Sequence, residues 1–383
     1  MGGAYPDPVR ILLVTGTTVG GSGRSQRELA ARLQDRGNEV RVLADPEVGS
    51  PLRRWAYEQL SDLRVRWGER PGHRVVGWLE ERPGRRVSET GLDGVHHLLT
   101  PVPENAVSQV VEASRPDVVV VSSVERLTWR KVRARCAALR VPTVLYVREV
   151  VTLDHLGSGQ SAPDAVVANA ASLARQVEQL GVPCEVLPSV IEVERTRVDS
   201  SREVALVVNP IESHGVDLVW TLADRLPDIP FVLQESWPLS GSQVLALERE
   251  AARRPNVELR RAEPPGPRLY RDTRVLLAPH RIDNRPRVIA EVQANGIPVI
   301  ASDLPGLVEA TGPGGLMVPP DDIDAWCRSV QALWSDEDSY RRLAAASRVH
   351  SEREAISAEA VAGRFEQLLH AVVSGRAPGG HLA

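Results

Sequence analysis

Two carboxylates eight residues apart, Asp283 and Glu291, lie in the stretch of the chain best equipped to bind a charged ligand. Asp283 belongs to a polar loop after an apolar run, and Glu291 lies about two turns inside the helix predicted to follow. Asp283 or Asn284 can cap that helix, and Pro286 suits its first turn. The free N–H groups and the dipole at the start of this helix favour a diphosphate.

Arginines surround the start of the same predicted helix, at Arg281, Arg285 and Arg287. A diphosphate carries about two negative charges, whereas a helix N-terminus supplies about half a unit of positive charge. We therefore expect a further cation, and Arg285 is the first candidate. His214 contributes charge only if its pKa rises near the anion. The alternative is that these are solvated surface arginines, because 45 of the 46 basic residues are arginine.

A second stretch suited to an anion follows the apolar run 11–14, where Gly16, Gly20, Gly21 and Gly23 predict a tight turn. Residues 25–37 have helical spacing of apolar side chains, so the start of a second helix points at the glycines. A dinucleotide-dependent dehydrogenase or a sugar-nucleotide glycosyltransferase could begin in this way.

The glycine spacing argues against the dehydrogenase. The dinucleotide-binding string G-x-G-x-x-G is absent. The Tyr-x-x-x-Lys pair of short-chain dehydrogenases is also impossible, because Lys131 is the sole lysine and Leu127 stands four residues before it.

Composition narrows the class of protein. The 383 residues favour two domains, and an apolar share of 42% is that of a globular chain with true cores. A net charge of −4 argues against general nucleic-acid binding. Three cysteines without C-x-x-C spacing fit a reducing, cytoplasmic compartment, and no apolar run reaches membrane-spanning length. The arginine bias suggests a GC-rich, bacterial coding genome.

Strands and helices alternate twice along the chain, which predicts two doubly wound parallel sheets. The expected strands are 11–14, 41–44, 116–122, 141–147, one ending near 168 and 184–190, then 204–210, 230–235, 256–261, 275–280 and 297–302. The expected helices are 25–37, 104–113, 130–139, one ending at 181, 217–226, 242–253, 286–295, 322–333 and 358–373. Asp322 and Asp324 are interpreted as residues that open a helix, in preference to a metal-binding D-x-D.

Residues 52–67 form an apolar stripe at helical spacing, flanked by arginines. This pattern is typical of a helix packed on a sheet. A peripheral contact with a membrane surface, at the inner face, is the alternative.

The stretch 276–322 resembles the family-4 retaining glycosyltransferases of the GT-B fold. The family carries an acid-x7-Glu motif followed by G-x-P-V-I-A-S-D-x-x-G-x-x-E. The second string is present here as Gly296, Pro298, Val299, Ile300, Ala301, Ser302, Asp303, Gly306 and Glu309. The glycine-rich segment 19–40 and the segment 163–196 also look like their counterparts in the family.

The resemblance implies an α/β protein of GT-B fold, with two Rossmann-like domains facing a central cleft. We expect an acceptor-side domain at 1–192, a sugar-nucleotide-binding domain at 193–357, a helix returning to the first domain at 358–374 and a disordered tail at 375–383.

The resemblance also implies the reaction, the transfer of a hexose-like sugar from a nucleoside-diphosphate sugar to an acceptor hydroxyl with retention of configuration. No metal or other cofactor is expected. The partners are the sugar nucleotide and an acceptor molecule, and the base, the sugar, the acceptor and the oligomeric state stay open.

Site roles follow from the same resemblance. Glu291 would bind the ribose, and Asp283 would lie near the donor-sugar hydroxyls. Backbone N–H groups at Arg287 and Val288 would hold the diphosphate, and Gly20 and Gly21 would approach the phosphates or the acceptor.

Four positions differ from the family pattern. Pro210 and His214 stand where the family has an arginine and a lysine that neutralise the diphosphate, and Arg148 stands where it has a histidine near the reaction centre. The first acid is aspartate in place of the usual glutamate. These differences motivate two alternatives, a non-catalytic sugar-nucleotide-binding or scaffold protein and a nucleotide-sugar epimerase of the same fold.

Overall fold

The computed structural model describes residues 7–18, 20–46, 86–122, 124, 126–156, 162–237, 239–262 and 266–376. The stripe predicted at 52–67, and the tail from residue 377 onward, lie outside the described residues. The chain divides into two compact units. Unit 1 comprises Met1–Asn169, Leu173–Val190 and Val361–Ala383, and unit 2 comprises Ala170–Ser172 and Ile191–Ala360.

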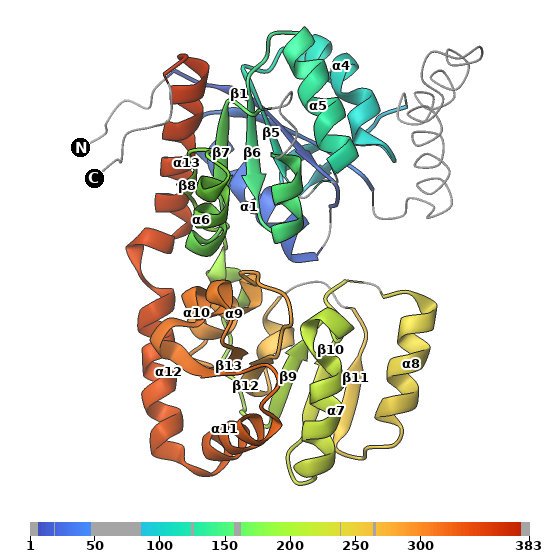
Figure 1. The fold of residues 1–383 in the computed structure, drawn as a ribbon, viewed down its shortest axis with the longest axis vertical. Coiled ribbons are helices and arrows are strands. Elements are labelled where there is room, and N and C mark those ends of the chain that lie inside the picture. The colour runs from blue at the N-terminus through green and yellow to red at the C-terminus, as the bar shows by residue number, and fades with distance from the viewer. Residues whose placement is uncertain are drawn as a thin grey trace. The chain divides into compact units, whose positions relative to one another are not determined.

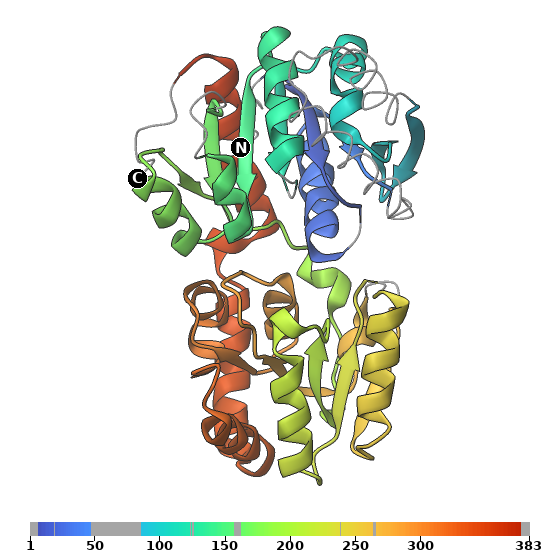
Figure 2. The same cartoon turned by 45° about the vertical axis from the view of Figure 1, so that its right-hand side comes forward.

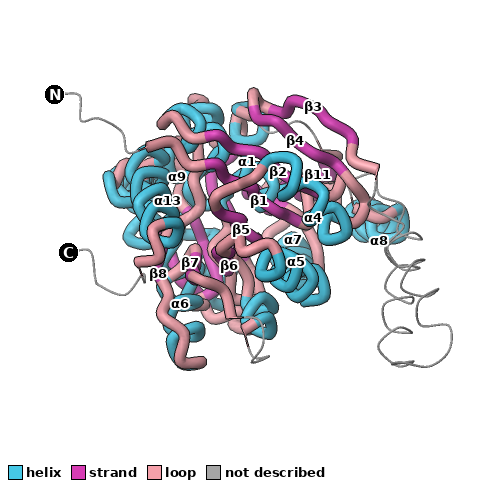
Figure 3. Tube along the Cα trace, turned by 90° about the horizontal axis from the view of Figure 1, so that it is seen from above, coloured by secondary structure: helices cyan, strands magenta, loops and turns pink. Residues whose placement is uncertain are grey.

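Unit 1 is built on an eight-stranded sheet with the strand order β3-β4-β2-β1-β5-β6-β7-β8 (Figure 3). All neighbours run parallel except the β3–β4 hairpin. Its strands are β1 (Arg10–Thr15), β2 (Glu39–Ala44), β3 (Ser88–Leu92), β4 (Val95–Leu99), β5 (Val118–Ser122), β6 (Thr143–Val147), β7 (Ala165–Ala168) and β8 (Glu185–Val186). The central strands are buried along their whole length, as expected for parallel strands with helices on both faces.

The described helices of unit 1 are α1 (Gly20–Asp35), α4 (Pro103–Ser114), α5 (Arg126–Ala138) and α6 (Ala171–Gln179), joined by most of α13 (Ala358–Val373). Glu366 of α13 is buried and accepts hydrogen bonds from Arg36 and Asn38, just after α1. The ring of Phe365 lies 5.6 Å from that of Tyr146 on β6. The last helix of the chain therefore contributes to the core of the first unit.

Unit 2 contains a six-stranded parallel sheet in the order β11-β10-β9-β12-β13-β14. The strands are β9 (Val204–Val208), β10 (Phe231–Gln234), β11 (Val257–Arg260), β12 (Thr273–Ala278), β13 (Val299–Ser302) and β14 (Gly315–Val318). The helices are α7 (Val216–Arg225), α8 (Gly241–Ala251), α9 (Arg287–Ala294), α10 (Pro305–Thr311), α11 (Ile323–Ser335) and α12 (Glu337–Ser351), as labelled in Figure 1. In Figure 2, α7 and α8 are the yellow-green and yellow helices of this unit.

Alternate residues of the unit 2 strands enter two separate cores, one on each face of the sheet. Ala205 and Val207 join the cluster that includes α7 and α11, whereas Leu206 and Val208 join the cluster that includes α9. The period-2 alternation of a strand explains this division. Tyr270, in the turn before β12, packs in the same cluster as α9.

The prediction of two parallel α/β sheets is confirmed, but some local predictions were wrong. Helix α1 begins at Gly20 rather than at residue 25, so Gly20, Gly21 and Gly23 belong to its first turns. A Cβ on Gly23 would lie 2.4 Å from the carbonyl carbon of Thr18, so glycine here permits close packing of the preceding loop. The β3–β4 hairpin and β14 were missed. Strands β3 and β14 are short and exposed or half-buried, and β4 has two histidines between its apolar residues, so each shows little apolar alternation.

Candidate functional site

The strand order of unit 2 reverses direction between β9 and β12. From β9 the chain proceeds to β10 and β11 on one side, and from β12 it proceeds to β13 and β14 on the other. In open α/β sheets, ligands bind beyond the carboxyl ends of the strands at such a reversal. A ligand site is therefore expected at the loops after β9 and β12.

Backbone contacts hold these two loops against each other. Gly215, which precedes α7, has a φ of +72°, and a Cβ there would lie 2.0 Å from the carbonyl oxygen of Pro279. The N–H of Arg281 donates to the carbonyl of Ser213 at 2.9 Å. Only glycine allows this close approach, so the two loops form one surface.

A pair of histidines joins the loops through their side chains. The rings of His214 and His280 stack with centroids 4.1 Å apart and an angle of 5° between their planes. The His214 Nδ1–H donates to the carbonyl of Asn209 at 3.0 Å, and the His280 Nδ1–H donates to Asn284 Oδ1 at 2.9 Å. Both acceptors lack a proton to give, so each ring carries its hydrogen on Nδ1.

Burial keeps both rings neutral. It lowers the pKa of His214 and, together with repulsion from His214, lowers the pKa of His280 to about 3. The hypothesis that His214 supplies positive charge thus requires a bound anion to raise its pKa. Asn209, in a left-handed conformation with φ +56°, also accepts from the N–H of Ser236 and so connects the loop after β10.

Helix α9 begins at Arg287, with Pro286 as its N-cap and no side-chain capping hydrogen bond. The prediction that Asp283 or Asn284 caps this helix was wrong. Asp283 Oδ1 instead accepts from the N–H of Gly306 in α10 at 2.6 Å, and Asn284 accepts from His280. Arg287 and Val288, the predicted diphosphate-binding residues, form the first turn of α9.

Glu291 is buried, with 3% of the residue exposed, and is held from two elements. The Nε–H of Arg287, one turn earlier, donates to Glu291 Oε1 at 2.7 Å. The phenol of Tyr270 donates to Oε2. The predicted ribose-binding carboxylate is therefore part of a network of hydrogen bonds within unit 2.

Each arginine near the start of α9 has a carboxylate partner. Arg281 pairs with Asp217 and with Asp321, the latter at 3.3 Å. Arg285 lies 3.7 Å from Glu309, and Arg287 pairs with Glu291. An incoming diphosphate would therefore have to compete with these carboxylates or draw on hydrogen bonds from neutral groups.

In unit 1, the candidate residues follow β1 and β6. Gly20, with a φ of +64°, and Gly21 open α1. Arg148 directly follows β6 and is 6% exposed, and its guanidinium carbon lies 4.5 Å above the ring of Tyr146. A guanidinium stays protonated, so Arg148 can stabilise negative charge but cannot act as a base.

No group of three or more His, Cys, Asp or Glu suited to a metal occurs among the described residues. Asp322 caps α11 by accepting from the N–H of Ala325 at 2.9 Å, as the interpretation of the D-x-D sequence expected. Within the described ranges, no helix has the length and apolar content needed to cross a membrane.

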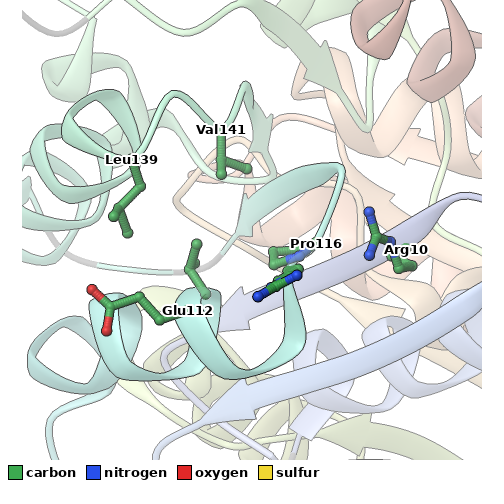
Figure 4. Close-up of a pocket in the computed structure, with 7 residues that line it drawn as sticks. Arg10, Glu112, Pro116, Leu139 and Val141 are labelled. Carbon is green, nitrogen blue, oxygen red and sulfur yellow. The ribbon is translucent and has the colours of Figure 1, made fainter.

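A cavity of about 490 Å³ lies in unit 1 near the amino end of β1 (Figure 4). It is lined by Arg10, Val111, Glu112, Arg115, Pro116, Leu139 and Val141. None of the predicted site residues lines it, and it lies away from the carboxyl ends where ligands of such sheets bind.

Comparison with solved structures gives the fold of the whole chain. Sucrose-phosphate synthase from Thermosynechococcus elongatus is 14% identical with a TM-score of 0.71, covering 95% of this chain and 99% of its own. The Anabaena protein HepE, solved in complex with UDP and glucose, is 15% identical with a TM-score of 0.69, covering 95% and 100%. The chain has the GT-B fold.

Other GT-B structures that resemble the chain include the catalytic domain of starch synthase IV from Arabidopsis thaliana, bound to ADP and acarbose. It is 12% identical with a TM-score of 0.66, covering 96% of this chain and 100% of its own. Residues 238–336 match the family model described as "Glycosyl transferases group 1". No curated protein sequence matches the chain.

The matched segment of this GT-B chain contains Asp283, Glu291 and Gly306, which the fold brings to one end of unit 2 with His214. Tyr270 and His280 were missed from the sequence, and Asn284 was named only as a helix cap. His280 ends the strand predicted at 275–280 and Asn284 neighbours Asp283, so their positions were visible but their pairing was not. Tyr270 gave no local signal, because its partner lies 21 residues away.

Proposed function

We propose that this protein is a glycosyltransferase that moves a hexose-like sugar from a nucleoside-diphosphate sugar to an acceptor hydroxyl. The observation that carries the proposal is the position of the acid-x7-Glu motif. Asp283 and Glu291 frame the start of α9 beside the strand-order reversal, within the segment that matches a glycosyltransferase family model. The GT-B relatives solved with UDP or ADP support a nucleotide donor.

The proposed reaction retains configuration. The bond between the anomeric carbon and the phosphate oxygen breaks, and the acceptor oxygen bonds to the same face of the sugar. The acceptor proton passes to the departing diphosphate. No metal or other cofactor is required in this proposal.

The proposed roles divide between the two units. Glu291 binds the ribose hydroxyls, Asp283 contacts the sugar, and the N–H groups of Arg287 and Val288 hold the diphosphate with Arg285 and His214. In unit 1, Gly20 and Gly21 allow close approach of the phosphates or the acceptor. Arg148 stabilises charge at the reaction centre.

The test is to incubate the protein with ADP-, GDP- and UDP-sugars and a panel of acceptors, and to measure nucleoside diphosphate release. We expect release that depends on the acceptor. Asp283→Asn should lower kcat by at least about tenfold with the fold intact, because it removes a charge at the sugar. Unchanged turnover in Asp283→Asn would contradict its role, and NMR of the product anomer tests retention.

A non-catalytic sugar-nucleotide-binding protein is the second candidate. The pairing of Arg281, Arg285 and Arg287 with carboxylates, beside two neutral histidines, favours it. Nucleotide binding without release of nucleoside diphosphate under any acceptor would support this candidate. The UDP-GlcNAc 2-epimerase of Neisseria meningitidis, at 14% identity and a TM-score of 0.53, motivates a separate assay for epimerised sugar.

We also propose a cytoplasmic location, with a peripheral membrane contact through residues 52–67 as the alternative to a helix that packs on the sheet. Sedimentation with anionic vesicles tests the contact. Substituting the apolar residues of the stripe with serine should abolish co-sedimentation, and binding that persists would contradict the contact.

A further inference from the structure

Tyr270 is fully buried yet has its polar end at the candidate site. It lies in the short turn Pro267–Tyr270 before β12, and 0% of the residue is exposed. Its ring packs in the cluster that includes Ile289 and Val292 of α9. Its hydroxyl donates to Glu291 Oε2. A side chain so placed cannot contact a ligand itself, but it can orient Glu291 toward a bound ligand.

Glu291 accepts hydrogen bonds from donors on two different elements. Arg287 belongs to the same helix and holds Oε1, whereas Tyr270 comes from a separate element and holds Oε2. One donor alone leaves a carboxylate free to rotate about its last bond. Two donors on different oxygens define its plane. An ionised and oriented carboxylate is what accepts hydrogen bonds from a pair of hydroxyls.

We propose that Tyr270 is a positioning residue that orients Glu291 toward the two ribose hydroxyls of the donor, so that selectivity for ribonucleotides depends on a phenol that does not touch the nucleotide. This inference rests on the proposed function, because it takes Glu291 as the ribose-binding group. It assigns to Tyr270 a role separate from the packing of its ring, since the hydrogen bond to Glu291 comes from the hydroxyl.

Tyr270→Phe separates the two roles, because it keeps the ring and removes the oxygen. The probes are ADP, GDP and UDP with their 2′,3′-dideoxy forms, measured by calorimetry on the full chain. Wild type should prefer the best ribonucleotide over its dideoxy form by about tenfold or more. Tyr270→Phe should shrink that preference by about three- to tenfold, while affinity for the dideoxy form stays unchanged.

Tyr340→Phe is the matched control. Tyr340 is also buried in unit 2, at 1% exposure, and stacks with Arg274 and Arg202. Its variant should lose no preference for ribose. The double variant Tyr270→Phe/Glu291→Gln should match Glu291→Gln alone in selectivity, because the phenol acts through the carboxylate.

The outcomes separate this inference from the proposed function. If Tyr270→Phe keeps the full ribose preference, or weakens both nucleotide forms equally, the positioning role is wrong while the proposed function stands. If wild type binds nucleotides but Glu291→Gln keeps the preference, Glu291 is not the ribose-binding group and Tyr270 has no such role. If wild type binds none of the nucleotides, the proposed function fails and the inference fails with it.

Discussion

The stacked histidines limit how this site can hold an anion. Each ring keeps its hydrogen on Nδ1, bonded to Asn209 or Asn284, so a neutral ring presents only a lone pair at Nε2. A lone pair repels a phosphate oxygen. His214 can therefore bind phosphate only after it takes up a proton, which the anion's charge would favour and the neighbouring His280 would not oppose while neutral.

The first prediction concerns binding of the nucleoside diphosphate as a function of pH. Because the pKa of His214 is lowered in the free protein and would be raised by the anion, affinity should rise as pH falls from 8 to 5.5. Calorimetry in buffers of different ionisation enthalpy should register proton uptake. His214→Asn should flatten the dependence, and the same slope in that variant would place the titrating group elsewhere.

The second prediction concerns stability in acid. His280 has a pKa of about 3 when folded and about 6.5 when unfolded, so between these values the unfolded chain binds the additional proton. The free energy of unfolding should therefore fall as pH drops through this window, by about 2 kcal/mol from pH 7.5 to pH 5. Urea unfolding of His280→Gln measures the contribution, because this variant should lose about 2 kcal/mol less over the same range. Equal losses of stability in wild type and His280→Gln would rule out this contribution of His280.

At the scale of elements, the site depends on two loops that cannot move apart without breaking backbone contacts. The turn before α7 packs on Pro279 after β12, and Gly215 makes this possible. The loop after β10 is attached through the hydrogen bond from Ser236 to Asn209. Three loops at the carboxyl ends of β9, β10 and β12 are thus held as one surface.

The third prediction is that Gly215→Ala destabilises unit 2 by about 2 kcal/mol or more. The positive φ and the 2.0 Å approach to the Pro279 oxygen both oppose a Cβ. Nucleoside diphosphate affinity should fall as well, because the strain falls on the loop that carries His214. Gly241→Ala is the control, since a Cβ there meets nothing within 4 Å. Comparable melting of both variants would show that the contact has no role.

At the scale of the whole chain, the final helix completes the core of unit 1. Glu366 accepts hydrogen bonds from Arg36 and Asn38, which lie 330 and 328 residues earlier in the sequence. Arg36 donates to one carboxylate oxygen and Asn38 to the other. The ion pair between Glu366 and Arg36, at 2.7 Å, has side-chain exposures of only 4% and 16%. Folding of the N-terminal unit therefore depends on residues at the other end of the sequence.

The fourth prediction is that Glu366→Ala lowers the free energy of unfolding of unit 1 by about 3 kcal/mol, because it removes the carboxylate of a largely buried ion pair. Thermal unfolding measures it. Asp324→Ala removes a carboxylate from a pair with Arg225 whose side chains are 67% and 49% exposed, and should change little. A small effect in Glu366→Ala would indicate that the α13 contact contributes nothing to stability.

The sequence by itself determined the alternation of strands and helices, and hence two parallel sheets, because burial of both faces leaves continuous apolar runs such as 118–121. It also determined where the motif lies, since Glu291 and Gly306 stand in a recognisable string. Both signals are local, so they can be read from neighbouring residues.

Only the tertiary structure decided the partners of the polar groups. Asp283 was expected to cap α9 but accepts from Gly306, 23 residues away, because the loop after β12 turns toward α10. The hydrogen-bond partners of Tyr270, His280 and Glu366 were likewise seen only in the structure. A buried polar atom must find a partner wherever the fold brings one, and sequence spacing predicts such partners only within a helix turn or a tight loop.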